Sequence, residues 1–395
     1  MHPRWLNRGV AGIGAASFLS DVGHEVPTSL LPALLTTTLG APAAALGTIE
    51  GIANGVAGAA QLAGGALADD PPRRRATAMG GYTATAILSA LIGAAGAVWQ
   101  VGVLRTGAWL SRGLRTPSRN ALLTDVVAPE AYGRAYGFER ALDNAGAIAG
   151  PLLALALLSL VGIRDAILLS VVPGLLAAVA IFVAIRAAPR YASRDHGRPP
   201  LRIRLRPVLR GRLGRLLAAV TAFELGNAAA TLLILRATNL LTPGHGHDSA
   251  VKLAVVLYAA YNAAAMATSL PAGHSTDRRG TTTVLVVGAV AVLAAYVGFA
   301  VTDSALGLLG VLFVLAGIGK GAVETAQSAA VAMLAPPELL GSAFGALAAI
   351  QSFGNLAASV VAGGLWTLVS PRAAFLYLAG WMAVSAAALV AADRR

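Results

Sequence analysis

The amino-acid sequence predicts an all-α, polytopic membrane protein with twelve transmembrane helices in two pseudosymmetric six-helix bundles. Three observations predict this fold class: an apolar composition, a succession of apolar stretches, and an internal repeat of half the chain. Of the 395 residues, 56% are hydrophobic and 12% are charged, and the mean hydropathy is +0.70. Soluble domains have about 45–50% apolar and about 25% charged residues. The composition therefore excludes a soluble globular protein.

The apolar stretches contain roughly 20 residues each, enough to cross a hydrocarbon core of about 30 Å. We expect membrane-spanning helices at residues 9–36, 43–67, 76–98, 100–126, 136–160, 166–186, 215–241, 251–272, 281–301, 305–334, 342–366 and 373–391. The longest polar break, between the sixth and seventh spans, is rich in arginine and contains Pro207. We therefore expect an N-terminal bundle at residues 1–186, a basic cytoplasmic linker at 187–214 and a C-terminal bundle at 215–395. The linker is either solvated or lies on anionic lipid headgroups.

One span of the chain is repeated 208 residues later without a gap, as from Gly65 to Gly273. The other repeated positions are Asp69 and Asp277, Asn54 and Asn262, Gly113 and Gly321, and residues 128–137 and 336–345. Secondary transporters are built from such repeats, with the functional site at the repeat interface near the membrane midplane. The repeat therefore predicts a transporter with two related bundles.

The basic residues are distributed unevenly over the predicted loops. The net charge is +12, but the loops on the side opposite the termini carry only Arg164, Lys252 and Arg372. This positive-inside bias predicts a multi-pass protein of the cell (inner or plasma) membrane with both termini in the cytoplasm. It also accounts for the basicity without a nucleic-acid partner. We expect no cleavable signal peptide, because the N-terminal residues lead directly into the first span without an A-x-A cleavage site.

Ionisable residues inside the spans are costly and mark a transport pathway. The third, sixth, ninth and twelfth spans have none in their interiors. We expect these four spans to face lipid and the other eight to enclose a polar pathway.

Three carboxylates and one histidine in the first two spans are candidates for proton coupling: Asp21, His24, Glu25 and Glu50. Asp21 and Glu25 are four residues apart, so they share one helix face. They lie at membrane depth, where a carboxylate can exchange protons within the physiological range, and His24 is placed to relay a proton. The alternative is a structural role, in which Arg105 or the backbone at a kink near Pro27 satisfies these groups.

Polar and aromatic groups on the spans that avoid lipid are candidates for substrate binding. They are Asn54, Arg105, Trp109, Glu224, Asn262, Lys320, Glu324, Gln327, Gln351 and Asn355. Asn and Gln in membrane helices also connect helices to one another, and we expect Lys320 to pair with Glu324. Packing between helices is therefore the alternative role for each of these residues.

Arg112, Arg115 and Arg119 form a stripe near the cytoplasmic end of the fourth span. We expect this stripe to pair with acidic residues of other helices and to act as a conformational latch that closes the inward side. The expected partners are Asp69, Asp125, Glu139 and Asp143. The alternative is a binding site for an anionic substrate.

Two loops and one helix carry motifs of a known family. The loop after the second span has the pattern Gly-x-x-x-Asp followed by arginines, and it recurs after the eighth span; the fifth span contains Gly-x-x-x-Gly-Pro. These motifs resemble those of the major facilitator superfamily, and the resemblance covers the whole chain. It implies two six-helix bundles, a latch that includes Gly65, Asp69, Arg73, Arg74, Gly273, Asp277 and Arg278, and an antiporter-associated helix-packing motif at Gly146, Gly150 and Pro151.

A narrower resemblance is to a bacterial branch of this superfamily with unassigned substrates. It rests on residues 20–25, 49–51 and 112–119. The chain departs from the superfamily pattern at Asp70 and Pro72, and from the branch at Asn120, where an aspartate is usual.

We expect a secondary active transporter that exports a small, largely apolar or cationic molecule in exchange for protons by alternating access. The alternative is an organic-anion symporter or antiporter that uses Arg105 and the arginines of the fourth span. An ATP-driven pump or an enzyme is not expected, because the sequence lacks the phosphate-binding, metalloprotease and serine-hydrolase motifs. Without a large soluble loop, a membrane sensor is not expected either. We expect a monomer in the lipid bilayer with no cofactor and no metal.

Overall fold

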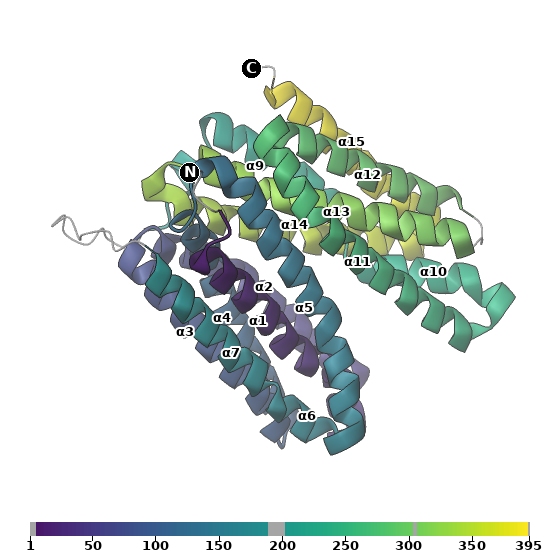
Figure 1. The fold of residues 1–395 in the computed structure, drawn as a ribbon. Coiled ribbons are helices and arrows are strands. Elements are labelled where there is room, and N and C mark those ends of the chain that lie inside the picture. The colour runs from purple at the N-terminus through teal and green to yellow at the C-terminus, as the bar shows by residue number, and fades with distance from the viewer. Residues whose placement is uncertain (1–4, 189–201, 303–305, 394–395) are drawn as a thin grey trace. The chain divides into compact units, whose positions relative to one another are not determined.

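The computed structural model describes residues 5–188, 202–302 and 306–393, and these ranges contain helices and connecting turns without a strand (Figure 1). Residues 189–201 of the expected linker and the terminal Arg4, Arg394 and Arg395 lie outside the described residues. The helices are α1 (Arg8–Ala33), α2 (Ala43–Ala68), α3 (Pro71–Leu91), α4 (Val98–Thr124), α5 (Tyr132–Val161), α6 (Ile163–Leu169), α7 (Val171–Ala187), α8 (Leu205–Val208), α9 (Gly211–Gly226), α10 (Ala230–His245), α11 (His247–Arg279), α12 (Thr281–Val301), α13 (Leu306–Leu334), α14 (Leu340–Leu368) and α15 (Pro371–Asp393).

The described residues include nine helical segments that are long and apolar enough to cross a membrane, which confirms a polytopic membrane protein. α1, α2 and α4 are equally long but do not reach the same hydropathy. α1 and α4 contain charged side chains, and Gly and Ala dominate α2. Because of these three helices, the count of twelve spans stays a prediction.

Two of the expected spans are interrupted. α6 and α7 together cover the sixth span and meet at Ser170. In the seventh span, α9 ends at Gly226 and α10 begins at Ala230. Interrupted helices expose backbone groups inside the membrane and are frequent at transport sites.

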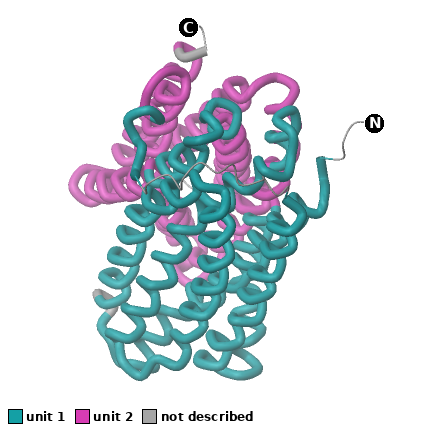
Figure 2. Tube along the Cα trace, turned by 90° about the vertical axis from the view of Figure 1, so that its left-hand side faces the viewer, with its two compact units in different colours: residues 1–135, 142–208, 331–349 teal, residues 136–141, 209–330, 350–395 magenta. Residues whose placement is uncertain are grey.

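The chain divides into two compact units, which Figure 2 colours separately. Unit 1 contains residues 1–135, 142–208 and 331–349. Unit 2 contains residues 136–141, 209–330 and 350–395. Each unit is therefore mostly one half of the sequence with a short segment from the other half. The expected bundle boundaries stay predictions.

Glycines at repeated positions allow the same close packing in both units. In unit 1, a Cβ atom added to Gly113 of α4 would lie 2.5 Å from the carbonyl oxygen of Ala57 in α2. In unit 2, a Cβ atom added to Gly321 of α13 would clash with the carbonyl of Ala265 in α11. Gly321 and Ala265 lie 208 residues after Gly113 and Ala57, so the second contact repeats the first. The repeat therefore preserves contacts between helices, and not only the hydropathy of single helices.

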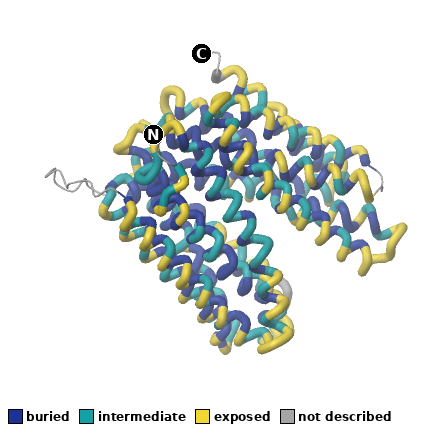
Figure 3. Tube along the Cα trace, viewed as in Figure 1, coloured by how far each residue is buried: buried dark blue, intermediate teal, exposed yellow. Residues whose placement is uncertain are grey.

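The burial pattern suits a membrane protein (Figure 3). Large apolar side chains remain exposed along α7 and α12, among them Val179 and Val287. Charged side chains of α1, α4 and α9 are buried instead, including Asp21, Arg105 and Glu224. In a membrane protein, an exposed apolar surface of this kind contacts lipid. The buried charges have no access to water there, so they require partners within the protein.

Candidate functional site

The charged residues of α1, α2 and α4 form a cluster within unit 1. We call it the first-unit cluster and define it as Asp21, His24, Glu25, Glu50, Arg105, Trp109 and Arg112. Asp21 lies 13 residues after the start of α1 at Arg8, a depth of about 20 Å at 1.5 Å per residue. All four residues expected to couple protons therefore belong to one cluster, on helices that we expect to span the membrane.

His24 lies between two carboxylates of its own helix. Its Nδ1 atom is 3.3 Å from Asp21 Oδ1, and its Nε2 atom is 3.3 Å from Glu25 Oε1. Arg112 of α4 reaches the same place, with Nη2 3.3 Å from Asp21 Oδ1 and Nη1 2.8 Å from His24 Nδ1. Asp21 and His24 are each only 6% exposed. Asp21, His24 and Arg112 thus lie within hydrogen-bonding reach of one another.

Glu50 and Arg105 form the second ion pair of the cluster. The Arg105 atoms Nη2 and Nε lie 2.8 and 2.9 Å from Glu50 Oε1, and Arg105 also donates to Thr28 Oγ1 at 3.1 Å. The guanidinium lies 3.7 Å from the ring centre of Trp109, whose Nε1 donates to Asn54 Oδ1 at 2.9 Å. Trp109 and Asn54, expected at a substrate site, therefore hold Arg105 in place in this structure.

The glycine motif of α5 packs directly against the carboxylates of α1. A Cβ atom added to Gly146 would lie 2.9 Å from Asp21 Cβ, and one added to Gly150 would clash with Glu25 Cβ. Only glycine leaves room for α1 to approach α5 this closely. The motif therefore determines where Asp21 and Glu25 lie.

The other arginines of the fourth span contact α1, α3 and α5. Arg115 donates to Ser20 Oγ at 2.6 Å, and its guanidinium lies 3.8 Å from the ring centre of Tyr82. Arg119 lies 3.3 Å from Asp143 Oδ1. Of the three stripe arginines, Arg119 thus contacts one of its expected partners, whereas Arg112 belongs to the first-unit cluster.

The latch residues of the loop after α2 have separate partners within unit 1. Asp69 accepts hydrogen bonds from the Ser342 amide at 2.8 Å and the Ser342 hydroxyl at 2.5 Å, so it caps the N-terminus of α14. Arg74 pairs with Asp125 at 2.7 Å, and Arg73 with Asp70 at 3.3 Å. Burial raises the pKa of Asp69 above its usual range, although the hydrogen bonds from Ser342 oppose this shift.

The glycines of the two loop motifs mark further close contacts. Gly65 lies against Gly341 and Gly345 within unit 1. Gly273 lies against Gly137 within unit 2. Also in unit 2, Glu139 pairs with Arg140 at 3.5 Å.

A chain of amide side chains surrounds Glu224 within unit 2. Asn227 Nδ2 donates to Glu224 Oε2 at 2.9 Å, and Gln327 Nε2 lies 3.4 Å from Glu224 Oε1. Gln351 donates to Gln327 Oε1 at 2.9 Å, and Asn355 to the carbonyl of Asn227 at 2.6 Å. Four candidate substrate-binding residues are therefore brought together: Glu224, Gln327, Gln351 and Asn355. Asn227 was not among the predicted site residues, although its place directly after Gly226 in an apolar span was a signal.

Other candidates of unit 2 have different partners. Lys320 and Glu324 are 3.9 Å apart, and Lys320 also lies 5.7 Å from the ring centre of Tyr261. Asn262 donates to the carbonyl of Tyr258 on its own helix at 3.1 Å. Asp277 and Arg278 lie in the last turn of α11.

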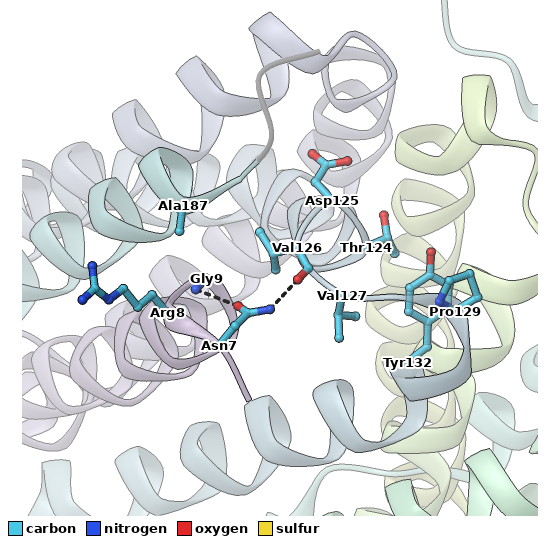
Figure 4. Close-up of a pocket in the computed structure, with 10 residues that line it drawn as sticks. All are labelled: Asn7, Arg8, Gly9, Thr124, Asp125, Val126, Val127, Pro129, Tyr132 and Ala187. Atoms are coloured by element: carbon cyan, nitrogen blue, oxygen red, sulfur yellow. Dashed lines mark hydrogen bonds between the residues drawn. The ribbon is translucent and has the colours of Figure 1, made fainter. Parts of the chain in front are cut away.

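A separate pocket of about 790 Å³ lies at the ends of α1, α4, α5 and α7 in unit 1. Figure 4 shows Asn7 in this pocket, where it donates to the carbonyl of Val126 and accepts from the amide of Gly9. Asp125, which pairs with Arg74, also lines the pocket. This pocket could not be predicted from the sequence, because its lining residues come from four separate helix ends.

Comparisons with known proteins agree with this architecture. The chain is 27% identical over 377 residues to an uncharacterized MFS-type transporter of Methanocaldococcus jannaschii, a match that covers 95% of this chain and 92% of that protein. It is 31% identical over 367 residues to an uncharacterized protein of Mycobacterium tuberculosis, covering 90% of this chain and 85% of that one.

Two solved structures share the fold at 15% sequence identity. One is the human organic anion transporter MFSD10 (TETRAN), with a TM-score of 0.74 over 97% of this chain and 99% of that chain. The other is a bacterial homologue of the iron transporter ferroportin in its outward-facing state, with a TM-score of 0.76 over 98% of this chain and 100% of that chain. The sequence model of the Major Facilitator Superfamily matches residues 13–257 and 237–395. Together with the helical fold and its internal repeat, these matches show that the chain belongs to the Major Facilitator Superfamily of membrane transporters.

Proposed function

We propose that this transporter exports a small, largely apolar or cationic molecule in exchange for protons. The observation that carries the proposal is the position of His24 between Asp21 and Glu25, with Arg112 in contact with Asp21 and His24. Titratable groups this close bind protons as a coupled set. A cluster of this kind inside a membrane helix is a candidate proton relay.

Proton binding at the first-unit cluster would change its ion pairs. When Asp21 is neutral, Arg112 loses a negative partner, and when a cationic cargo approaches Asp21 or Glu25, the proton is favoured to leave. Ion pairs in low-dielectric surroundings stabilise little but respond strongly to the loss of one charge. The cluster therefore supplies a physical reason for proton and cargo to alternate. In this proposal the protein works by alternating access, as a monomer in the cell membrane with both termini in the cytoplasm.

A second candidate function is transport of an organic anion. It is favoured by the burial of Arg105 and by the exposure of Arg112, whose side chain is 30% exposed. The fold shared with a human organic anion transporter is compatible with it. However, Arg105 and Arg112 each contact a carboxylate, so an anion would have to displace Glu50 or Asp21. This competition makes the cation or apolar cargo our first choice.

The experiment is substrate-dependent proton movement in proteoliposomes that contain the purified protein and a trapped pH-sensitive dye. A panel of small organic cations, neutral compounds and organic anions would be added in turn. Proton movement that depends on cations or neutral compounds supports export by proton exchange. Proton movement driven only by anions supports the second candidate. Cargo transport without proton movement would contradict proton coupling.

A further inference from the structure

Glu224 is a buried carboxylate at the interruption of the seventh span. It lies in the last turn of α9, three residues before the non-helical segment that precedes α10. The residue is 3% exposed. An acidic side chain buried beside a broken membrane helix is a candidate ligand-binding group.

The partners of Glu224 are neutral. Both of its oxygens accept from amide groups, those of Asn227 and Gln327, and the described residues place no Lys or Arg within ion-pair distance of it. A buried carboxylate with neutral partners keeps much of the desolvation cost of its charge. Binding a proton removes this cost, whereas the surrounding amides can hydrogen-bond either form.

The groups that face Glu224 from neighbouring helices do not offset its charge. Glu324 of α13 has the same sign and acts against a negative Glu224, while Lys320 lies 3.9 Å from Glu324. Tyr261 on α11 and Tyr296 on α12 also interact electrostatically with Glu224, and neither side chain supplies a positive charge. α14 presents Gly354 to Glu224, and the α15 residues that contact the end of α9, Trp381 and Met382, are uncharged.

Glu224 is also the counterpart of Asp21 in the other half of the chain. Asp21 lies 13 residues after the start of α1 at Arg8, and Glu224 lies 13 residues after the start of α9 at Gly211. Each has a polar partner three residues later, His24 or Asn227.

The two carboxylates also pack against equivalent glycines. Gly146 lies against Asp21 and Gly354 lies against Glu224, and these glycines are related by the 208-residue repeat. The difference is the nearby cation. Arg112 reaches Asp21, but its repeat equivalent Lys320 pairs with Glu324 instead of Glu224.

We propose that Glu224 is a second proton-binding site, equivalent by pseudosymmetry to Asp21 but without a cationic partner. Its carboxylate takes up one proton from water to form a neutral acid and returns that proton to water when it is exposed again. The role of this site in coupling rests on the proposed function, but proton binding itself can be measured without transport.

The test is infrared difference spectroscopy of the protein in lipid nanodiscs between mildly alkaline and mildly acid pH. A neutral carboxylic acid has a carbonyl stretching band that a carboxylate lacks. We expect this band to grow on acidification in the wild type and to lose one carboxyl equivalent in Glu224→Gln. The matched control is Glu338→Gln, which removes an exposed carboxyl in the short turn Pro337–Leu339 before α14. The control should keep the buried-acid band.

A second measurement uses only the wild type, so it does not depend on the folding of a variant. An apolar carbodiimide adds to protonated carboxyl groups inside membranes: the acid oxygen bonds to the carbodiimide carbon, and the acid proton moves to nitrogen. We expect mass spectrometry to locate the adduct on Glu224, with a yield that rises as the pH falls. An unchanged infrared band in Glu224→Gln, or no adduct on Glu224 at acid pH, would overturn the proposal. Neither result depends on whether the proteoliposome assay detects coupled transport.

Discussion

At the scale of single residues, the first-unit cluster combines charge neutralisation with titratable groups. Asp21, Glu25 and Glu50 provide three carboxylates. Arg105 contacts Glu50, Arg112 contacts Asp21, and His24 contacts Glu25. His24 is the group whose ordinary titration lies closest to neutral pH. Binding of a proton can therefore change the net charge of the cluster while each arginine keeps a hydrogen-bond acceptor nearby.

Replacing Asp21 by Asn tests the coupling role of the cluster. Asn fixes a neutral side chain but keeps an oxygen that can accept from Arg112, so folding should survive. We expect uptake driven by a pH gradient to fall to the level of empty inside-out vesicles, while exchange without a gradient continues. Asp165→Asn, which changes an exposed residue of α6, is the matched control. Full gradient-driven accumulation by Asp21→Asn would exclude Asp21 as the proton carrier.

Glu50→Gln tests the second ion pair. The substitution leaves Arg105, which is 1% exposed, without its negative partner. Breaking a fully buried pair costs about 3–5 kcal/mol. Because the Glu50 side chain is 29% exposed, water can compensate in part, and we expect a loss of about 1–3 kcal/mol. Thermal unfolding in detergent measures it, and Glu50→Gln combined with Arg105→Gln should recover part of the loss. A single variant as stable as the wild type would contradict a structural role for the pair.

At the scale of elements, small residues determine how closely helices approach each other. The contact of Gly113 with α2 and that of Gly321 with α11 are two copies of one arrangement. A larger side chain in either place meets a backbone carbonyl, which cannot rotate away. The repeat has therefore conserved the positions at which helix axes must be close.

Gly113→Ala should destabilise the protein, and Gly321→Ala should do the same. Overpacking of this kind costs about 1–3 kcal/mol, whereas Ala in place of an unconstrained helical Gly gains about 0.5–1 kcal/mol. Gly80→Ala in α3 is the control, because a Cβ atom added there meets nothing within 4 Å. We expect a lower melting temperature for the first two variants and an equal or higher one for the control. Equal behaviour of all three would show that these glycines do not limit packing.

At the scale of the whole molecule, one carboxylate joins segments that are 273 residues apart in sequence. Asp69 caps the first turn of α14 through Ser342, where a carboxylate also interacts favourably with the helix dipole. Because burial raises the pKa of Asp69, protonation of Asp69 favours this arrangement over one in which the side chain is exposed. The stabilisation that protonated Asp69 gives to this arrangement is complete below the ordinary pKa of Asp and is lost as the pH rises through the raised pKa of Asp69.

Asp69→Asn should therefore change turnover and remove this pH dependence, while insertion and folding remain largely intact. Asn keeps an oxygen that can accept from the Ser342 amide, and it stays neutral at every pH. Asp277→Asn should have a smaller effect, because the arginines of α4 lie in the same half of the chain as Asp69. Transport rates measured over a pH series at matched expression check both variants. Unchanged rates in both would contradict a latch at these loops.

The sequence by itself determined that the protein lies in a lipid bilayer, that its fold is helical, and that it contains an internal repeat. Hydropathy, helix length and repeat spacing are properties of the chain alone, so the polytopic fold and the superfamily could be predicted and were confirmed. The ionisable residues inside the spans included most members of the first-unit cluster, and the polar residues included most members of the group around Glu224. Which charges lie together was decided only by the tertiary structure, since it depends on the rotation and crossing of separate helices. Arg112 contacts Asp21 and His24 instead of the expected latch acids. Asn227 contacts Glu224 at the break in the seventh span, where α9 has ended and α10 has not yet begun. Long-range partners of this kind leave no periodic signal in the sequence, because the type of a residue does not specify whether its partner is an ion, an amide or a glycine.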